Sequence, residues 1–203
     1  MMQLTKLPYT KRFRHGLLAS SILALGVLHA PVWADDDLSY TFLDLEYVDT
    51  ELDDGPDLSG DGFGASASVA IGKHMFLSAG YLDQEFDDNV DAEQRALGLG
   101  LHAPLGDGLD LIGQVSYVDV ELDTPFGDAE DDGYGVGVGL RGRLGDTFEL
   151  EGMLNYLDLD DSGDDTSVSL GARYYVSEGF AFGIGADLTD DATTWRAGIR
   201  FEF

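Results

Sequence analysis

Carboxylate side chains recur along this chain at a fixed spacing behind a tyrosine. The copies are Tyr117-Val118-Asp119-Val120-Glu121, Tyr47-Val48-Asp49-Thr50-Glu51, Tyr81-Leu82-Asp83-Gln84-Glu85 and the more divergent Tyr156-Leu157-Asp158-Leu159-Asp160. Hard divalent cations prefer several oxygen ligands of this kind. The repeats therefore predict acidic external segments that bind Mg²⁺ or Ca²⁺ loosely, and the alternative is a solvated acidic rim that binds no ion.

Three of these acidic-segment residues suggest a more defined metal site. Asp158-x-Asp160-x-Ser162-Gly163 resembles the start of a calcium-binding loop. The twelfth position of such a loop would be Ser169, where a bidentate glutamate is required. Asp158, Asp160 and Ser162 are therefore a weak candidate metal site, and we expect no cofactor other than loosely bound Ca²⁺ or Mg²⁺.

Enzymatic chemistry has little support in the sequence. The histidines after residue 34 are His74 and His102, both near expected turns, and neither has a serine or carboxylate neighbour that forms a catalytic triad. Pairs of carboxylates that can act as acid and base occur by chance in so acidic a chain. We therefore expect no enzymatic activity and assign no catalytic residue.

A second group of charged residues lies in segments where apolar residues alternate with small or polar ones. These charged residues all occupy the small or polar positions of that alternation, and so share one face. The basic members are Arg141, Arg143, Arg173, Arg196 and Arg200, and the acidic members are Asp44, Glu46, Asp110, Glu149, Glu151 and Glu202. If this parity faces an enclosed interior, unpaired charges would be costly there, so we expect an ion-pair network. Such a network either plugs the interior or lines a narrow cation-preferring pore, and the sequence leaves both readings open.

The segments that carry these residues alternate apolar and small or polar side chains. In the stretch 92–103, Leu97, Leu99 and Leu101 alternate with Ala96, Gly98 and Gly100. We count ten strands of about 9 to 12 residues, the length of a tilted strand that crosses a bilayer; eight strands is the alternative. Short turns alternate with acidic loops such as 50–61 and 122–132. The pattern predicts an all-β fold, a closed antiparallel transmembrane barrel with short periplasmic turns and acidic external loops.

The orientation of the two faces follows from their composition. One face is mostly glycine, serine and alanine with scattered charges, which suits a sealed interior better than a water-exposed surface. The other face is apolar, and Tyr47, Tyr81, Tyr117 and Tyr156 lie on it near the acidic segments. These four tyrosines are predicted to form the outer aromatic girdle at the membrane interface.

Residues 1–34 have the features of a secretory signal peptide. Four basic residues precede an apolar stretch at 16–28, and Val32-Trp33-Ala34 is a suitable cleavage site. The predicted barrel domain, residues 35–203, keeps 7 Lys and Arg against 39 Asp and Glu, a formal charge of −32. Such a surface repels nucleic acid. The chain has no cysteine, so the exported domain is held together without disulfides.

The last residues carry a family resemblance. Trp195-x-Ala197-x-Ile199-x-Phe201-x-Phe203 resembles the C-terminal signal by which the barrel assembly machinery recognises bacterial outer-membrane barrels, and Trp195, Ile199, Phe201 and Phe203 are its key positions. The chain after residue 34 resembles a small outer-membrane β-barrel of the broad OmpA-like or porin-family type, without a periplasmic peptidoglycan-binding domain.

The resemblance implies a place and partners for the chain. Its location would be the outer membrane, and its partners would be outer-membrane lipid, lipopolysaccharide, the barrel assembly machinery and periplasmic chaperones, with the protein as a monomer. We expect a structural or surface-interaction role, with the small cation-preferring pore as the alternative.

Overall fold

The strands of the computed structural model follow the alternation of the sequence. The model describes residues 38–52, 59–87 and 89–203, so the predicted signal peptide lies outside the described residues. The strands are β1 (Phe42–Leu52), β2 (Ser59–Ala70), β3 (Met75–Phe86), β4 (Val90–Gly106), β5 (Leu109–Thr124), β6 (Gly127–Leu144), β7 (Phe148–Leu159), β8 (Gly163–Ser177), β9 (Phe180–Leu188) and β10 (Ala192–Glu202). No helix of the described residues is long and apolar enough to cross a membrane.

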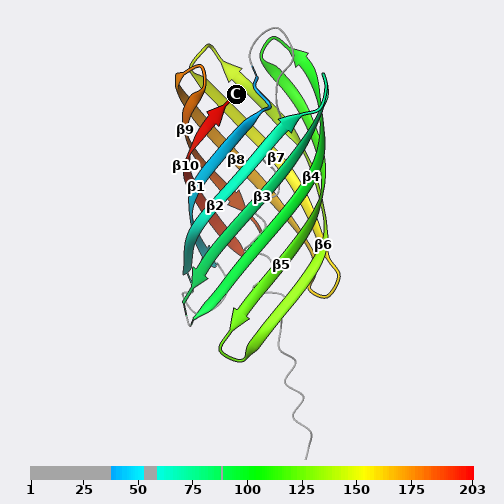
Figure 1. Ribbon diagram of the computed structural model, residues 1–203, viewed down its shortest axis with the longest axis vertical. Coiled ribbons are helices and arrows are strands. Elements are labelled where there is room, and N and C mark those ends of the chain that lie inside the picture. The colour runs from blue at the N-terminus through cyan, green and yellow to red at the C-terminus, as the bar shows by residue number, and fades with distance from the viewer. Residues whose placement is uncertain (1–37, 53–58, 88) are drawn as a thin grey trace, which may run out of the picture.

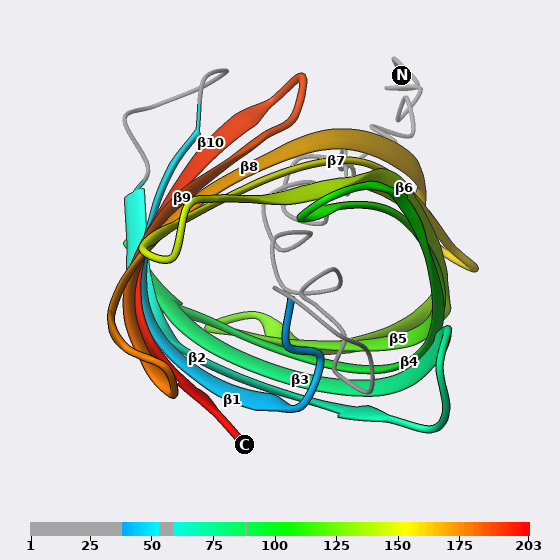
Figure 2. The same ribbon diagram turned by 90° about the horizontal axis from the view of Figure 1, so that it is seen from above.

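The ten strands form one closed barrel. Each strand pairs antiparallel with its sequence neighbour, and β1 pairs with β10 to close the ring (Figures 1 and 2). Closure leaves no unpaired strand edge, which a bilayer requires because it offers no hydrogen-bonding partner to an open edge. The predicted closed antiparallel ten-strand barrel is therefore confirmed, and the eight-strand alternative is wrong.

Several strands are longer than the predicted 9 to 12 residues. β4 has 17 residues, β5 has 16 and β6 has 18. The predicted loop at residues 122–132 is wrong, because β5 and β6 stay paired up to Thr124 and Gly127. The predicted loop at residues 50–61 is also too long, since β1 continues to Leu52 and β2 begins at Ser59. The β5–β6 hairpin extends beyond its neighbours at the end of the barrel opposite the C-terminus (Figure 1).

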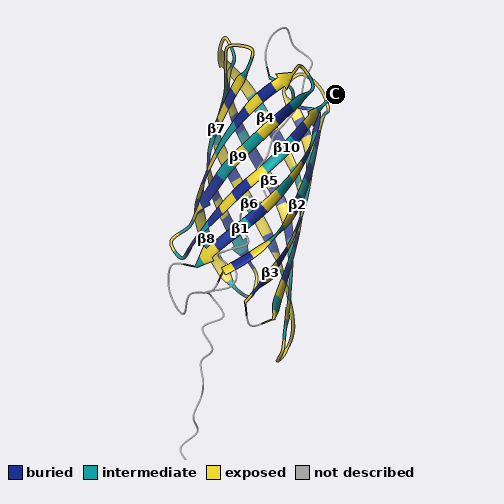
Figure 3. Ribbon diagram, turned by 90° about the vertical axis from the view of Figure 1, so that its left-hand side faces the viewer, coloured by how far each residue is buried: buried dark blue, intermediate teal, exposed yellow. Residues whose placement is uncertain are grey.

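The two faces of the barrel have the predicted orientation. Large apolar side chains such as Leu97, Leu99 and Leu101 are exposed on the outside, while Ala96 and Gly100 are buried within. Buried and exposed positions alternate along the strands (Figure 3). The exposed apolar band is the surface that lipid covers in a transmembrane barrel.

Inward-facing glycines in β6 allow close approach between strands. A Cβ added at Gly139 would collide with the carbonyl oxygen of Gly152 and with the sulfur of Met153. Gly113, which faces outward on the neighbouring β5, has no atom within 4 Å of the position that its Cβ would take. The glycine at position 139 is therefore needed for packing, whereas the one at position 113 is not.

This difference gives a matched pair of substitutions. Gly139→Ala is expected to lower the free energy of unfolding by about 1–3 kcal/mol, since the backbone of β7 has to shift to relieve the collision. Gly113→Ala is expected to leave it nearly unchanged. Urea titrations of both variants, refolded in lipid vesicles, measure the difference. Equal stability of the two variants would show that β6 and β7 are not packed as described.

Candidate functional site

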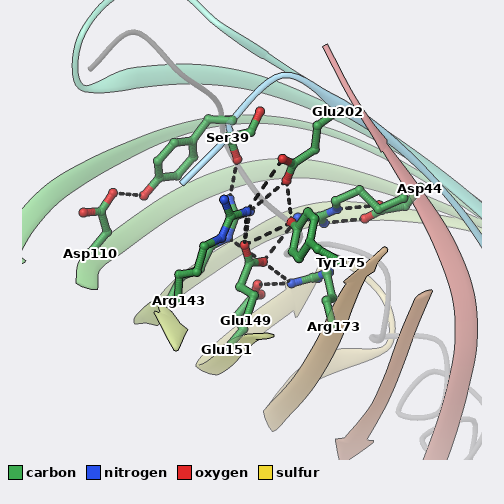
Figure 4. A network of polar contacts seen from close by, with 12 residues as sticks. Ser39, Asp44, Asp110, Arg143, Glu149, Glu151, Arg173, Tyr175 and Glu202 are labelled. Carbon is green, nitrogen blue, oxygen red and sulfur yellow. Dashed lines mark hydrogen bonds and ion pairs between the residues drawn. The ribbon is translucent and has the colours of Figure 1, made fainter. Parts of the chain in front are cut away.

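Glu149 is the centre of an ion-pair network inside the barrel (Figure 4). Its carboxylate accepts two hydrogen bonds from Arg141, each 2.8 Å long, and one from Arg173 at 2.8 Å. Arg143 at 3.4 Å and the Tyr175 hydroxyl at 3.1 Å reach the second oxygen. Arg141 and Glu149 are both 0% exposed. A carboxylate surrounded in this way neutralises part of the charge of several buried arginines at once.

The remaining lumen charges extend the network. Arg173 also binds Glu151 at 3.1 Å, and Arg143 and Arg141 both lie 3.7 Å from Glu202. The guanidinium of Arg200 forms two hydrogen bonds with Asp44, at 2.6 and 2.7 Å, and stacks on the Phe42 ring at 3.6 Å. All the lumen charges predicted from the sequence therefore face the interior, and the structure brings them together near the end that carries the C-terminus.

Two members of the lumen set have different partners from the central group. Arg196 pairs with Asp187 at 2.6 Å and with Glu46 at 3.6 Å. Asp187 was not among the predicted lumen residues. Side chains alternate between the two faces of β9, and Asp187 lies on the same face as the buried Ala181, opposite to the exposed Phe182. Asp187 therefore faces inward.

The residues before β1 turn into the barrel at the same end (Figure 2). The carbonyl oxygen of Ser39 accepts a hydrogen bond of 2.7 Å from Arg141, and the Tyr40 hydroxyl donates to Asp110. Tyr40 is buried and packs with Phe76, Ile112 and Met153. This segment therefore adds an apolar and hydrogen-bonded cover to the charged network.

The opposite half of the lumen contains an apolar cluster, which the sequence interpretation missed. Its members are Val48, Leu82, Phe86, Ala92, Ala96, Val118, Val120, Leu157 and Leu159, with Val90 and Leu122 packed against them. All nine members are buried. The expectation that the inward face is mostly glycine, serine and alanine with scattered charges is therefore wrong at this end. We call this set the lumen cluster.

Polar side chains without charge occupy the region between the network and the lumen cluster. Asn155 donates to the hydroxyls of Ser167 and Ser169 at 3.3 and 2.9 Å, and Gln114 donates to Ser78 at 3.0 Å. A cavity of about 20 Å³ lies beside Gln114 and Asn155. That volume holds about one water molecule.

The outer face of the external end is acidic and arranged in register. Six carboxylates lie directly opposite one another across neighbouring strands from β1 to β6. They are, in lateral order, Asp49, Asp61, Glu85, Asp91, Asp123 and Asp128. We call them the acidic row. Directly opposed side chains on one sheet face have Cβ atoms about 4.5–5.5 Å apart, so like charges there repel. At the hairpin tip, outside the membrane-spanning part, the charge of Asp128 raises the pKa of Asp123.

One basic residue lies among these carboxylates. Arg95 binds Glu93 at 2.5 Å, Glu121 at 2.7 Å and Asp119 at 3.2 Å. The other basic residues after residue 34 are Lys73, in the turn before β3, and the five lumen arginines. Positive charge is therefore concentrated inside the barrel, and negative charge is concentrated on its outer rim.

The predicted girdle tyrosines, Tyr47, Tyr81, Tyr117 and Tyr156, are all exposed on the outer face next to the acidic residues. Tyr134 lies beside Tyr117 in the adjacent strand and is also exposed. At the C-terminus, Trp195, Phe201 and Phe203 are exposed on the same outer face, and Ile199 is half-buried. These positions suit side chains that meet lipid or its headgroups.

The candidate calcium residues lie where β7 ends and β8 begins: Asp158 is in β7, and Asp160 and Ser162 are in the turn that follows. Asp131 of β6 accepts hydrogen bonds from the backbone N–H groups of Asp161 and Ser162, at 3.1 and 2.8 Å, and Asp158 accepts one from the Tyr134 hydroxyl at 2.8 Å. Among the described residues, no group of three or more His, Asp or Glu side chains is placed to hold a metal ion. The calcium site at Asp158, Asp160 and Ser162 stays a prediction.

The prediction about the neighbours of His102 requires a correction. The sequence offered it no carboxylate neighbour, but the pairing of β4 with β5 places the Asp110 carboxylate 2.8 Å from its Nδ1. The Tyr40 ring stacks on the His102 ring with centroids 3.9 Å apart. A histidine and a carboxylate eight residues apart meet here because a short turn joins two paired strands.

These features together define a class of protein. A closed barrel with an even number of antiparallel strands, an apolar outer band and charged side chains within is the architecture of bacterial outer-membrane β-barrels. The model of the family described as outer membrane protein beta-barrel domain matches residues 20–203, and the chain belongs to this family. The protein is therefore an outer-membrane β-barrel.

Comparison with individual proteins adds little to this assignment. No curated protein matches the chain. Among solved structures, the KdgM porin is 12% identical with a TM-score of 0.46, and the match covers 79% of this chain and 99% of that one. The corresponding values for the NanC porin are 9%, 0.47, 79% and 100%. For the N-terminal β-barrel domain of Pseudomonas aeruginosa OprF they are 14%, 0.44, 80% and 98%. At such low identities and TM-scores, these likenesses say nothing about what this chain binds or transports.

Proposed function

We propose that this protein is a structural and surface-interacting barrel of the outer membrane whose lumen is closed to ions. The observation that carries the proposal is the filling of the lumen at two levels. The ion-pair network around Glu149 occupies the periplasmic half, and the lumen cluster occupies the external half. A buried apolar layer opposes the passage of hydrated ions because it offers them no polar ligand.

The acidic row and its neighbours are the proposed contact surface. Their carboxylates lie next to the exposed tyrosines, and we infer that they meet the phosphates of lipopolysaccharide there. The repulsion between opposed carboxylates is lowered when divalent cations bind between them. Mg²⁺ or Ca²⁺ can also bridge these carboxylates to lipid phosphates. The proposed partners are lipopolysaccharide and outer-membrane lipid, with loosely held divalent cations as the link. The regular opposition of the carboxylates supports this proposal.

Removal of divalent cations tests the contact surface. A chelator is expected to lower the melting temperature of the barrel in vesicles that contain lipopolysaccharide, by roughly 2–4 °C for each kcal/mol of cation binding that is lost. Asp61, which faces both Asp49 and Glu85, gives a matched variant: Asp61→Asn is expected to reduce the chelator effect. An unchanged melting temperature in wild-type protein would show that cations do not link the rim to the lipid.

The small cation-preferring pore is the second candidate, and the acidic rim is the observation that favours it. Negative charge at a mouth raises the local concentration of cations. A pore would also need a continuous polar path through the lumen. The apolar side chains of the lumen cluster oppose such a path. Conductance of the refolded protein in a planar bilayer separates the two functions.

The proposal extends to export and assembly. Residues 1–34 are proposed to act as the signal peptide. The terminal residues Trp195, Ile199, Phe201 and Phe203 are proposed to bind the barrel assembly machinery after delivery by periplasmic chaperones. The barrel is proposed to act as a monomer and without catalysis.

A further inference from the structure

Two histidines lie directly opposite each other at the periplasmic mouth of the barrel. Met75 pairs with Leu101, and the N–H of His102 donates to the carbonyl oxygen of His74 at 3.0 Å. His74 and His102 therefore occupy facing positions, one residue beyond that pair. Both share the inward parity of the buried Phe76. Facing side chains on one sheet face start about 4.5–5.5 Å apart at Cβ.

The ring of His102 is held in a defined state by its neighbours. Its Nδ1 lies 2.8 Å from the Asp110 carboxylate, which can only accept, so Nδ1 carries the proton. The Tyr40 hydroxyl also donates to Asp110, and the Tyr40 ring stacks on the imidazole and fixes its tilt. In the neutral imidazole, this arrangement leaves Nε2 with a lone pair. Histidines that bind metals are commonly oriented in this way, by a carboxylate on the nitrogen that does not bind the metal.

Nε2 of His102 accepts no hydrogen bond from the described residues. His102 Nε2 is buried and has no hydrogen-bond partner there. A buried polar atom without a partner costs free energy, so it calls for an explanation such as an ion or a water molecule. His74 is exposed in the turn before β3, and its ring can change rotamer rapidly.

The distance between the two rings fits one shared ion. Their centroids are 5.7 Å apart with the ring planes tilted by 58°. Two imidazoles that bind one ion through nitrogens at about 2.0–2.1 Å have centroids roughly 4.5–6.4 Å apart. The observed centroid separation lies inside this range, and a rotamer of His74 that turns one of its nitrogens toward Nε2 of His102 would complete the pair of ligands.

We propose that His74 and His102 form a two-histidine site for a transition-metal dication, with Asp110 and Tyr40 as positioning residues. Imidazole ligands select Cu²⁺, Ni²⁺ or Zn²⁺ over Mg²⁺ and Ca²⁺, and Cu²⁺ binds such ligands most tightly in this series. Water completes the coordination, because the described residues place no third His, Asp or Glu ligand at the site. The site is independent of the acidic row, which lies at the opposite end of the barrel and offers only oxygen ligands.

Copper binding to the refolded barrel tests this site. Cu²⁺ is titrated into the protein in detergent with an excess of Mg²⁺, which occupies the carboxylates of the rim, and electron paramagnetic resonance reports the nitrogens bound to copper. Wild-type protein is expected to bind one Cu²⁺ with two imidazole nitrogens. His74→Ala and His102→Ala are each expected to retain at most one imidazole and to bind more weakly. Asp110→Asn is expected to keep both imidazoles with an affinity about 10–100-fold lower.

The exposed position of His74 keeps the test independent of folding. His74→Ala lies outside the buried contacts, and a difference in the mobility of this variant between heated and unheated gel samples verifies that the barrel has formed. The double variant His74→Ala/His102→Ala measures copper bound elsewhere on the chain. A wild-type spectrum without two imidazole nitrogens, or a spectrum and affinity unchanged in His74→Ala, would overturn the proposal.

Discussion

Replacing Glu149 by glutamine is expected to lower the free energy of unfolding by about 3–5 kcal/mol, because the substitution leaves buried arginine charge uncompensated. Glu149 is 0% exposed and accepts hydrogen bonds from Arg141, Arg173, Arg143 and Tyr175. Glutamine has nearly the same shape but no charge, and its NH₂ group faces donors. Urea titration in lipid vesicles, followed by tryptophan fluorescence and by mobility on unheated gels, measures the loss.

Glu178→Gln is the matched control for this substitution. Glu178 is exposed in the turn between β8 and β9, where the same chemical change is expected to alter stability by no more than about 0.5 kcal/mol. If Glu149→Gln were no less stable than Glu178→Gln, the ion-pair network would contribute nothing to the fold. The barrel interior would then have to be hydrated.

The second large effect is expected inside the lumen cluster. Leu82 is fully buried within this cluster, so Leu82→Ala leaves a cavity and is expected to cost about 2–5 kcal/mol of unfolding free energy. Leu97 is a leucine of the adjacent strand that faces outward, and it is 65% exposed before lipid is considered. Lipid chains can fill the space that Leu97→Ala creates, so this variant is expected to lose much less stability. The same urea titration compares the two.

This pair of leucines also tests which face of the barrel meets the membrane. Both substitutions remove the same atoms, and only the surroundings differ. A larger loss for Leu97→Ala than for Leu82→Ala would mean that the outward leucines fill a protein core. The assignment of lipid-facing and lumen-facing sides would then be reversed.

The barrel could be predicted from the sequence because a strand places alternate residues on opposite faces. Leu97, Leu99 and Leu101 against Ala96, Gly98 and Gly100 were sufficient to give the strand and its orientation. The inward set from Asp44 to Glu202 followed from the same parity. Pairing partners within the network did not follow, because the register between strands is not visible in the alternation of any one strand. The contact of His102 with Asp110 depends on that register.

The sequence of β5 contains a signal for the lumen cluster. Up to Tyr117, the outward positions of β5 are apolar and the inward ones are polar apart from Ile112, as in Val115 and Ser116. Beyond it, Asp119 and Glu121 point outward while Val118 and Val120 point inward. The outer face there meets water and headgroups rather than lipid chains, so the polarity of the two faces is exchanged. Because of this exchange within one continuous strand, the sequence pattern predicts a loop at residues 122–132 where the structure has paired strands.

The closed lumen is tested most directly by single-channel recording from the refolded protein in a planar bilayer. The lumen cluster and the network around Glu149 predict a current that stays at the leak level of the bilayer at all applied voltages, while a general porin inserted under the same conditions gives steps. Discrete steps from this barrel, with a reversal potential shifted toward that of the cation in a salt gradient, would contradict the closed lumen and establish the pore.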